Sequence, residues 1–215
     1  MENRMIAGGR MAIMLTAIAI AAFMDGLDGS IVSIVLPDIG RSLNVDTDTS
    51  SWVTIIYFLV LSALIIPFAR ISADIGPRRV LAVGFAVFTI GSLFCGLVSS
   101  FYPMIATRAL QAAGAAAMAA AGPMCCTSHL PPNKLAFGLT LVTIGSSLGF
   151  ALGPVVGGAI VSGMDWHWIF LINIPVGAAA VPMILWAIPK GAEKGGRPRI
   201  ADMRGCVLLC AGIVL

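Results

Sequence analysis

Three ionisable side chains lie inside long apolar stretches of the sequence. Asp25 and Asp28 fall within residues 11–36, and Arg108 falls within residues 102–127. If these stretches cross a membrane, each charge there costs roughly 2.5–3.5 kcal/mol on insertion scales, and such residues usually mark a functional site. Asp25 and Asp28 are three residues apart, so on a helix they share one face. A carboxylate in such a place can bind a proton or a cation, or can pair with an arginine.

The depths of these residues predict which of them meet. Asp28 lies eight residues before Leu36, and Arg108 lies seven residues after Phe101, which places both about 10–12 Å below the same membrane boundary. Two interpretations of their contact remain open from the residues alone: a proton-coupling site, or a fixed ion pair that joins two helices. Asp25 lies deeper with no obvious partner. It is either a proton-carrying or cation-binding acid, or a water-facing bystander.

The composition explains why these stretches are expected to cross a membrane. Of the 215 residues, 59% are hydrophobic and 11% are charged, whereas soluble domains average about 25% charged residues. A soluble enzyme is therefore excluded as the default class. Because no ten-residue alternation typical of a β-barrel is present, we predict an all-α polytopic membrane protein. Six apolar runs are long enough to span a bilayer: residues 11–36, 52–69, 80–100, 102–127, 136–162 and 167–189.

The remaining polar and reactive residues argue against several other functions. The formal net charge of +3 is too small and too dispersed for a nucleic-acid surface. The five cysteines lie in apolar stretches without metal-ligand spacing, and His129 and His167 lie at opposite ends of the predicted spans. The sequence has no cluster of His or Glu residues of the kind that activates a nucleophile in an enzyme. We therefore expect no metal, no cofactor and no enzymatic activity.

Lys and Arg are distributed unevenly between alternate loops. Arg41 stands alone on one side, and the other side carries Arg4, Arg10, Arg70, Arg78, Arg79, Lys134, Lys190, Lys194, Arg197, Arg199 and Arg204. The positive-inside rule therefore predicts a cytoplasmic amino terminus and cytoplasmic even-numbered loops in the cell membrane. The first run is interpreted as an uncleaved helix, because it is longer than the apolar region of a signal peptide and five more runs follow it.

The composition changes after the sixth run. We predict a six-helix bundle over residues 1–189, a cytoplasmic linker rich in Gly, Pro and Lys/Arg over residues 190–203, and the start of a seventh span over residues 204–215. The last apolar run has ten residues, from Cys206 to Leu215, and as a helix it would cover about 15 Å of a core roughly 30 Å thick. We expect the chain to be part of a longer protein.

A regular glycine spacing marks the fifth run. Gly145, Gly149, Gly153 and Gly157 recur every fourth residue, beside Pro154 and Gly158. Such a stripe lets another helix pack at close range, and Pro154 removes one backbone hydrogen bond. In the sixth run, Asn173 and Pro175 are interpreted as a local hydrogen-bonding and kinking device, with substrate contact by Asn173 as the alternative.

Five stretches, in order along the chain, resemble motifs of one transporter family. They are LDGSIVSIVLP at 27–37, RALQAAGAA at 108–116, GFALGPVVGG at 149–158, WHWIFLINIPVG at 166–177 and IADMRG at 200–205. The chain resembles the major facilitator superfamily, and specifically its proton-coupled drug antiporters with fourteen membrane spans. Gly149, Gly153, Pro154, Gly157 and Gly158 match the fifth-helix antiporter motif of that group in full. His167 stands where that group usually has arginine.

The loop between the second and third runs matches less well. In ARISADIGPRR, residues 69–79, Gly76, Arg78 and Arg79 fit the family's gating motif. Ala73 replaces its aspartate, and Asp74 lies one position late. In the family that aspartate belongs to a latch that stabilises the outward-facing state, and the role is not carried over to Asp74.

The resemblance implies a fold of two six-helix bundles that rock about a central cavity, of which this chain holds the amino-terminal one. It implies that Asp28 and Arg108 belong to a proton-coupling centre, and that Asp25, Gln111 and Asn173 line a substrate cavity. The glycines of the fifth helix would form the bundle interface that closes.

The function implied by the resemblance is proton-driven efflux of amphipathic, often cationic, small molecules. It needs the bilayer, the proton gradient and a carboxy-terminal half, and it involves no nucleic acid. Two alternatives remain: proton-coupled uptake of a metabolite by a carrier of the same superfamily, and a non-transporting fragment that needs a second half.

Overall fold

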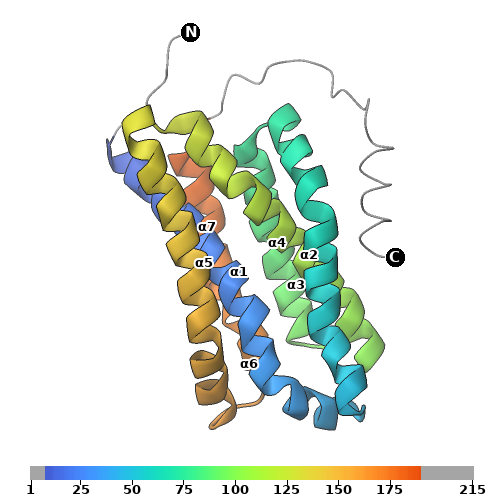
Figure 1. Cartoon of the computed structure of the whole chain (residues 1–215). Coiled ribbons are helices and arrows are strands. Elements are labelled where there is room, and N and C mark those ends of the chain that lie inside the picture. Colours follow the sequence, from blue (N-terminus) through green and yellow to red (C-terminus); the bar gives the residue numbers. More distant parts are fainter. Residues whose placement is uncertain (1–7, 190–215) are drawn as a thin grey trace.

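The computed structural model describes residues 8–189 of the chain, and over that range the chain is helical, without β-strands (Figure 1). Within residues 8–189, six segments are long and apolar enough to span a membrane, as the hydropathy predicts. The expected linker at 190–203 and seventh span at 204–215 lie outside the described residues. The helices are α1 (Gly8–Leu43), α2 (Thr47–Ile75), α3 (Pro77–Cys95), α4 (Phe101–His129), α5 (Pro132–Val161), α6 (Trp168–Leu171) and α7 (Asn173–Ala187).

Helix α1 is longer than the apolar run that predicts it. The run ends at Leu36, but the helix continues through Pro37 to Leu43, and its last turns carry an exposed ion pair of 2.6 Å between Arg41 and Asp38. An ion pair three residues apart on a helix supports that helix in water. Hydropathy marks where the apolar span ends, whereas polar side-chain pairing extends the helix beyond it.

The sixth span consists of two helices. α6 ends at Leu171, Ile172 forms a turn, and α7 begins at Asn173. Pro175 has no N–H to donate to the carbonyl four residues earlier, at Leu171, so the helical hydrogen bonding is interrupted there. The interruption expected near Pro175 is therefore present, and it leaves Asn173 at the first turn of α7.

Helices α1 and α5 pack closely against each other through the glycine stripe. A Cβ on Gly145 would lie 2.7 Å from the Ala19 carbonyl oxygen, and one on Gly149 would collide with the carbonyl oxygen of Phe23. The expectation that these glycines lie between two bundles is corrected here, since they pack against α1 of the same bundle. Gly158 lies off this contact and has open space at its Cβ position.

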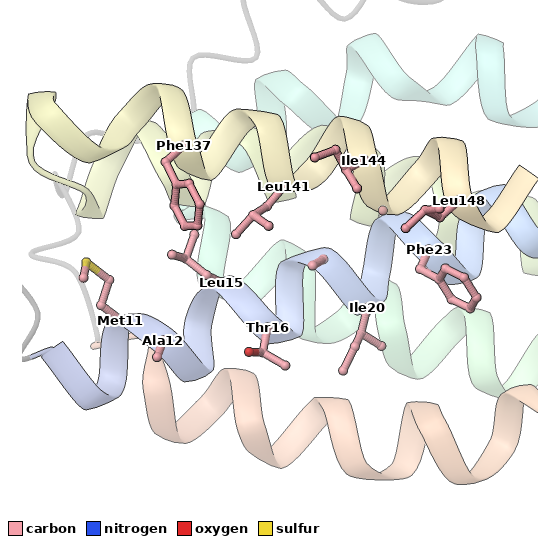
Figure 2. A pocket seen from close by; sticks show the side chains of 12 residues that line it. Met11, Ala12, Leu15, Thr16, Ile20, Phe23, Phe137, Leu141, Ile144 and Leu148 are labelled. Atoms are coloured by element: carbon pink, nitrogen blue, oxygen red, sulfur yellow. The ribbon is translucent and has the colours of Figure 1, made fainter.

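Beside this contact, α1 and α5 border an apolar groove of about 630 Å³ (Figure 2). Its lining is almost entirely hydrocarbon, with Thr16 as the polar exception: Met11, Ala12, Leu15, Thr16, Ala19, Ile20, Phe23, Phe137, Leu141, Ile144, Gly145 and Leu148. A groove with this lining has no charged group with which to select an ionic ligand.

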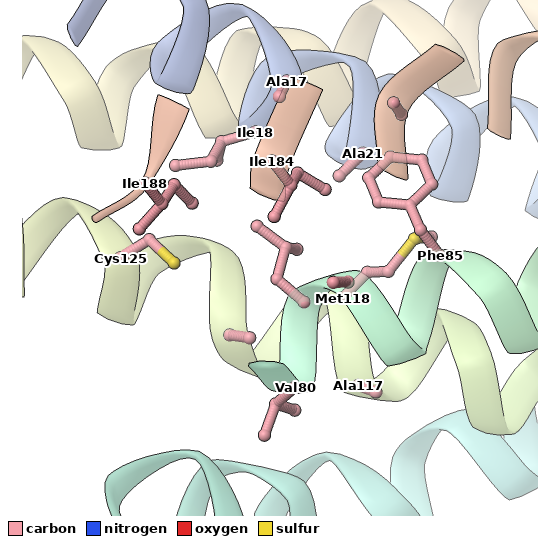
Figure 3. Close-up of a cluster of buried hydrophobic side chains, with 14 of the residues drawn as sticks. Ala17, Ile18, Ala21, Val80, Phe85, Ala117, Met118, Cys125, Ile184 and Ile188 are labelled. Carbon is pink, nitrogen blue, oxygen red and sulfur yellow. The ribbon is translucent and has the colours of Figure 1, made fainter. Parts of the chain in front are cut away.

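Two apolar clusters fill the interior of the bundle. The larger one joins α1, α3, α4 and α7 through side chains such as Ile18, Phe85, Met118 and Ile184 (Figure 3). A second cluster, which includes Ile31, Val53, Cys95, Met104 and Phe170, fills the opposite end.

The boundary between the two clusters positions the polar residues. On α1, Asp28 lies between Met24 of the first cluster and Ile31 of the second. On α4, Arg108 lies between Ala112 and Met104 in the same way. The charged residues therefore form a thin polar layer with hydrocarbon on both sides, where electrostatic interactions are strong and unpaired charges are costly.

Candidate functional site

Asp28 of α1 and Arg108 of α4 meet inside this layer. Arg108 Nη1 lies 2.6 Å from Asp28 Oδ2, and neither side chain has any solvent-exposed surface. The contact between them, predicted from their depths in the sequence, is confirmed. Charge-assisted hydrogen bonds of this length are among the stronger polar contacts in proteins.

Arg108 makes further contacts within α4 and with two other helices, α2 and α6. Its Nε donates to the backbone carbonyl of Val53 at 3.2 Å, and its Nη1 also donates to Gln111 Oε1 at 2.7 Å. The guanidinium carbon lies 4.3 Å from the ring centroid of Tyr57 and 5.5 Å from that of Phe170. Nη2 has no hydrogen-bond partner among residues 8–189. The cation is therefore held mainly by aromatic faces and by acceptors at two of its three nitrogens.

The second carboxylate oxygen of Asp28 is bound by two amides. Gln111 Nε2 donates to Oδ1 at 2.8 Å, and Asn173 Nδ2 donates to it at 3.2 Å. Both amides also donate to Ser92 Oγ, at 2.7 and 3.2 Å. The network thus joins α1, α3, α4 and α7, and both oxygens of the Asp28 carboxylate have donors.

Gln111 and Asn173 therefore lie elsewhere than the cavity wall on which the resemblance placed them. They are 0% and 1% exposed, and their amides contact Asp28 and Ser92. Ser92 was missed in the sequence, because a single serine in an apolar run of α3 gives no local signal of a partner on another helix.

Asp25 occupies a different environment from Asp28, one turn away. It lines a cavity of about 120 Å³ between α1, α4 and α5, which Met118, Val142 and Ser146 also border. Its Oδ1 accepts a hydrogen bond of 2.9 Å from the hydroxyl of Tyr57 on α2. Asp25, for which the sequence gave no partner, thus has one, and it combines a charge with an accessible space.

The loop between α2 and α3 contains the gating-motif residues. Gly76 has φ = 97°, a conformation that residues with a Cβ rarely adopt, so glycine is required there. Arg78 Nη2 donates to the carbonyl of Leu185 at 2.6 Å and so joins α3 to α7. Within the described part of the chain Asp74 forms no ion pair.

His167 joins two loops at the opposite end of the bundle. It bonds to Asp165 through its backbone N–H and its ring Nδ1, and its Nε2 lies 3.2 Å from the Val98 carbonyl oxygen. The ring stacks on Trp166 with centroids 3.7 Å apart. The hydrogen bonds from His167 lower the pKa of the Asp165 carboxyl.

One stretch of α5 has the spacing of a hydrolase motif that the sequence reasoning overlooked. Residues 145–149 read GSSLG, which has the GxSxG spacing. A serine nucleophile of that kind sits on a sharp turn between a strand and a helix, whereas these residues lie within α5, with Gly145 and Gly149 against α1. The spacing here reflects helix packing. Residues 8–189 also contain no group of three His, Cys, Asp or Glu that could hold a metal ion.

Comparisons with known proteins agree on one family. The family model of the Major Facilitator Superfamily matches residues 18–209. The chain is 34% identical over 200 residues to the putative multidrug resistance protein MdtD of Enterobacter sp. (strain 638), covering 93% of this chain and 42% of that protein. It is 36% identical over 180 residues to the riboflavin transporter RibZ of Clostridioides difficile (strain 630), covering 83% of this chain and 39% of that protein.

Solved structures show the same fold at lower identity. A bacterial homolog of the human lysosomal transporter Spinster, in an inward-facing and occupied conformation, matches with a TM-score of 0.68 and 20% identity, over 89% of this chain and 48% of that chain. Its inward-facing, unoccupied conformation matches with a TM-score of 0.64 and 18% identity, over 92% of this chain and 47% of that chain. The chain thus spans less than half the length of these relatives.

Proposed function

Because the chain belongs to the major facilitator superfamily, we propose that this multi-pass membrane protein contributes the amino-terminal bundle of a transporter that exports amphipathic, often cationic, organic molecules in exchange for protons. The observation that carries the proposal is the pairing of two unlike acids on one face of α1. Asp28 is enclosed with Arg108, whereas Asp25 borders a cavity.

In this proposal Asp28 and Arg108 are the proton-coupling pair. A proton on Asp28 would remove the negative charge that faces Arg108, and in a layer flanked by hydrocarbon that change is poorly screened. The donors of Gln111 and Asn173 to Asp28 Oδ1 support a carboxylate held ready for this exchange. The proton gradient supplies the energy, and no cofactor takes part.

Asp25 is the proposed contact for the cationic part of the substrate. One carboxylate oxygen is bound by Tyr57, and the neighbouring cavity is lined mainly by apolar and small side chains. Few charges and a largely hydrocarbon wall favour ligands that combine an apolar body with a positive charge.

Two further features support export. Several relatives at 33–34% identity are named putative multidrug resistance proteins, and the sequence contains the complete stretch GFALGPVVGG. The excess of Lys and Arg in alternate loops supports a cytoplasmic amino terminus in the cell membrane.

A second candidate function is proton-coupled uptake of a metabolite. The relative named riboflavin transporter, at 36% identity, favours it. Since this chain covers 39–42% of such relatives, a third proposal is that it transports only together with a carboxy-terminal half.

Ethidium uptake into inverted vesicles, which is the direction of export in these vesicles, tests the export proposal under an imposed pH gradient. The 215-residue chain, and the same gene read through its natural downstream sequence, are each compared as wild type, Asp28→Asn and Asp38→Asn. Asp38 is an aspartate on the same helix whose side chain is 37% exposed, so its variant controls for the change of residue type.

The proposal expects ethidium transport that is lost in Asp28→Asn and kept in Asp38→Asn. If only the longer product transports, the chain needs its second half. Absence of gradient-driven transport from both products, or normal transport by Asp28→Asn, contradicts proton-driven export through Asp28.

A further inference from the structure

Tyr57 contacts both halves of the proposed site with opposite parts of one side chain. Its hydroxyl donates to Asp25 Oδ1 at 2.9 Å, and its ring centroid lies 4.3 Å from the guanidinium carbon of Arg108. The side chain is 0% exposed, so packing from all sides determines its position. The charged groups near it are Asp25 and Asp28 on α1 and Arg108 on α4.

Helix α2 contacts Arg108 at a second residue besides Tyr57. Val53, one helical turn before Tyr57, accepts a hydrogen bond of 3.2 Å from Arg108 Nε. Residues four apart share a helix face, so the same face of α2 holds the arginine through a carbonyl and through an aromatic ring. A movement of this face therefore acts directly on Arg108.

Arg108 is placed to respond to such a movement. Its Nη1 serves both Asp28 and Gln111, while its Nη2 has no hydrogen-bond partner among residues 8–189. A guanidinium with an unused donor has another contact to gain when the ring beside it shifts. Cation–π attraction grows when the pair is shielded from water, as it is here.

We propose that Tyr57 is the positioning residue through which a cationic substrate at Asp25 and the Asp28–Arg108 pair sense each other. A cation that binds the Asp25 carboxylate competes with the Tyr57 hydroxyl for that carboxylate. The released phenol changes the position of its ring against Arg108, and Arg108 changes its hold on Asp28. By linkage, the charge on Asp28 alters the affinity of Asp25 for the cation by the same factor.

This inference rests on the proposed function, because it needs Asp28 to be the coupling acid. Its test is a comparison of ethidium affinities, measured by fluorescence anisotropy in detergent, on the form of the protein that transports ethidium in the vesicle assay. Asp28→Asn mimics the uncharged acid. The ratio of the ethidium dissociation constants with and without Asp28→Asn measures the coupling between the two sites.

We expect this ratio to differ from one by about tenfold in the wild-type background. In Tyr57→Phe, which keeps the ring and loses only the hydroxyl, the ratio falls to about one. Tyr102 is the other tyrosine of the chain, 84% exposed on α4, and Tyr102→Phe keeps the wild-type ratio. Should Tyr57→Phe fail to fold, Tyr57→Leu is the second variant. It removes both contacts, and the ratio must then also fall to about one.

The possible results distinguish the role of Tyr57 from the coupling role of Asp28. A tenfold ratio that persists in Tyr57→Phe or Tyr57→Leu overturns the role of Tyr57 and leaves Asp28 as the coupling acid. A ratio of one in the wild-type background contradicts the coupling role of Asp28, and the inference falls with it. A merely structural role for Tyr57 would lower ethidium affinity equally in both members of each pair and leave the ratio unchanged.

Discussion

At the scale of single residues, the polar layer is governed by the cost of leaving a charge unpaired in hydrocarbon. Arg108 and Asp28 are enclosed together, with donors or acceptors from Gln111, Asn173 and Val53. Removing one partner of a buried ion pair typically costs about 3–5 kcal/mol, whereas replacing both is often nearly neutral. Asp25 has less support, since one hydroxyl and a small cavity surround it.

Arg108→Leu is therefore expected to destabilise the bundle by about 3–5 kcal/mol, because the buried Asp28 carboxyl loses its counterion. The double variant Asp28→Asn/Arg108→Leu is expected to recover a large part of that loss. Unfolding of the purified protein in mixed micelles, titrated with a denaturing detergent, measures both. Equal stability of the single and double variants would show that the pair is not held by mutual charge compensation.

The loop before α6, which contains Asp165 and His167, makes a smaller electrostatic contribution to stability. Hydrogen bonds from the backbone and ring of His167 lower the pKa of Asp165 below its ordinary value of 3.8. A carboxyl whose folded-state pKa is lowered stabilises the fold above its ordinary pKa, and this contribution is lost as the pH falls through the folded-state value.

Wild type is therefore expected to exceed Asp165→Asn slightly in thermal midpoint at about pH 5, with a smaller difference at about pH 3. Thermal unfolding in detergent at the two pH values measures it. A difference that stays constant with pH would mean that the carboxylate charge is irrelevant to the loop.

At the scale of elements, the sequence predicts spans better than it predicts partners. The six apolar runs correspond to the six spans, and Pro175 correctly marks the interruption between α6 and α7. The glycine stripe predicts close packing, but not that α1 is the helix that packs there, because local spacing carries no information on the neighbour. For the same reason Tyr57 and Ser92 were not predicted as partners of Asp25 and of the Asp28 network.

Gly149→Ala tests the packing of α1 on α5. Its Cβ would collide with the Phe23 carbonyl oxygen, which belongs to backbone and cannot turn aside. We expect a loss of about 1–3 kcal/mol, as in overpacked cores. Gly158→Ala, on the same helix with open space at its Cβ, is the matched control and should change stability little. Equal effects of the two variants would contradict the close contact.

At the scale of the whole molecule, the chain spans less than half the length of the relatives that it matches. The chain covers 42% of the first relative named above and 48% of the matched Spinster homolog. Helices α2 and α5 have large apolar side chains exposed, such as Phe58, Ile66, Ile144 and Val155. The proposed orientation in the membrane rests on the distribution of Lys and Arg between loops. The proposed proton coupling rests on the roles of Asp25, Asp28 and Arg108.

The proposed orientation is tested by cysteine labelling in whole cells. Lys134→Cys, in the first turn of α5, should react with a membrane-impermeant maleimide only after the cells are opened, whereas Arg41→Cys should react in intact cells. The native Cys95, Cys125 and Cys126 are buried, and the wild-type chain gives the background. The reverse labelling pattern would invert the topology.

Proton movement driven by substrate alone tests proton-coupled export through Asp28. Ethidium is added to one side of proteoliposomes that contain the transport-competent form, and a trapped pH dye records the internal pH without any imposed proton gradient. If ethidium is exchanged for protons through Asp28, ethidium entry drives protons out. The internal pH then rises in wild type and in Asp38→Asn, and it does not change in Asp28→Asn. Ethidium movement without a pH change, or an unaltered pH change in Asp28→Asn, would contradict this exchange.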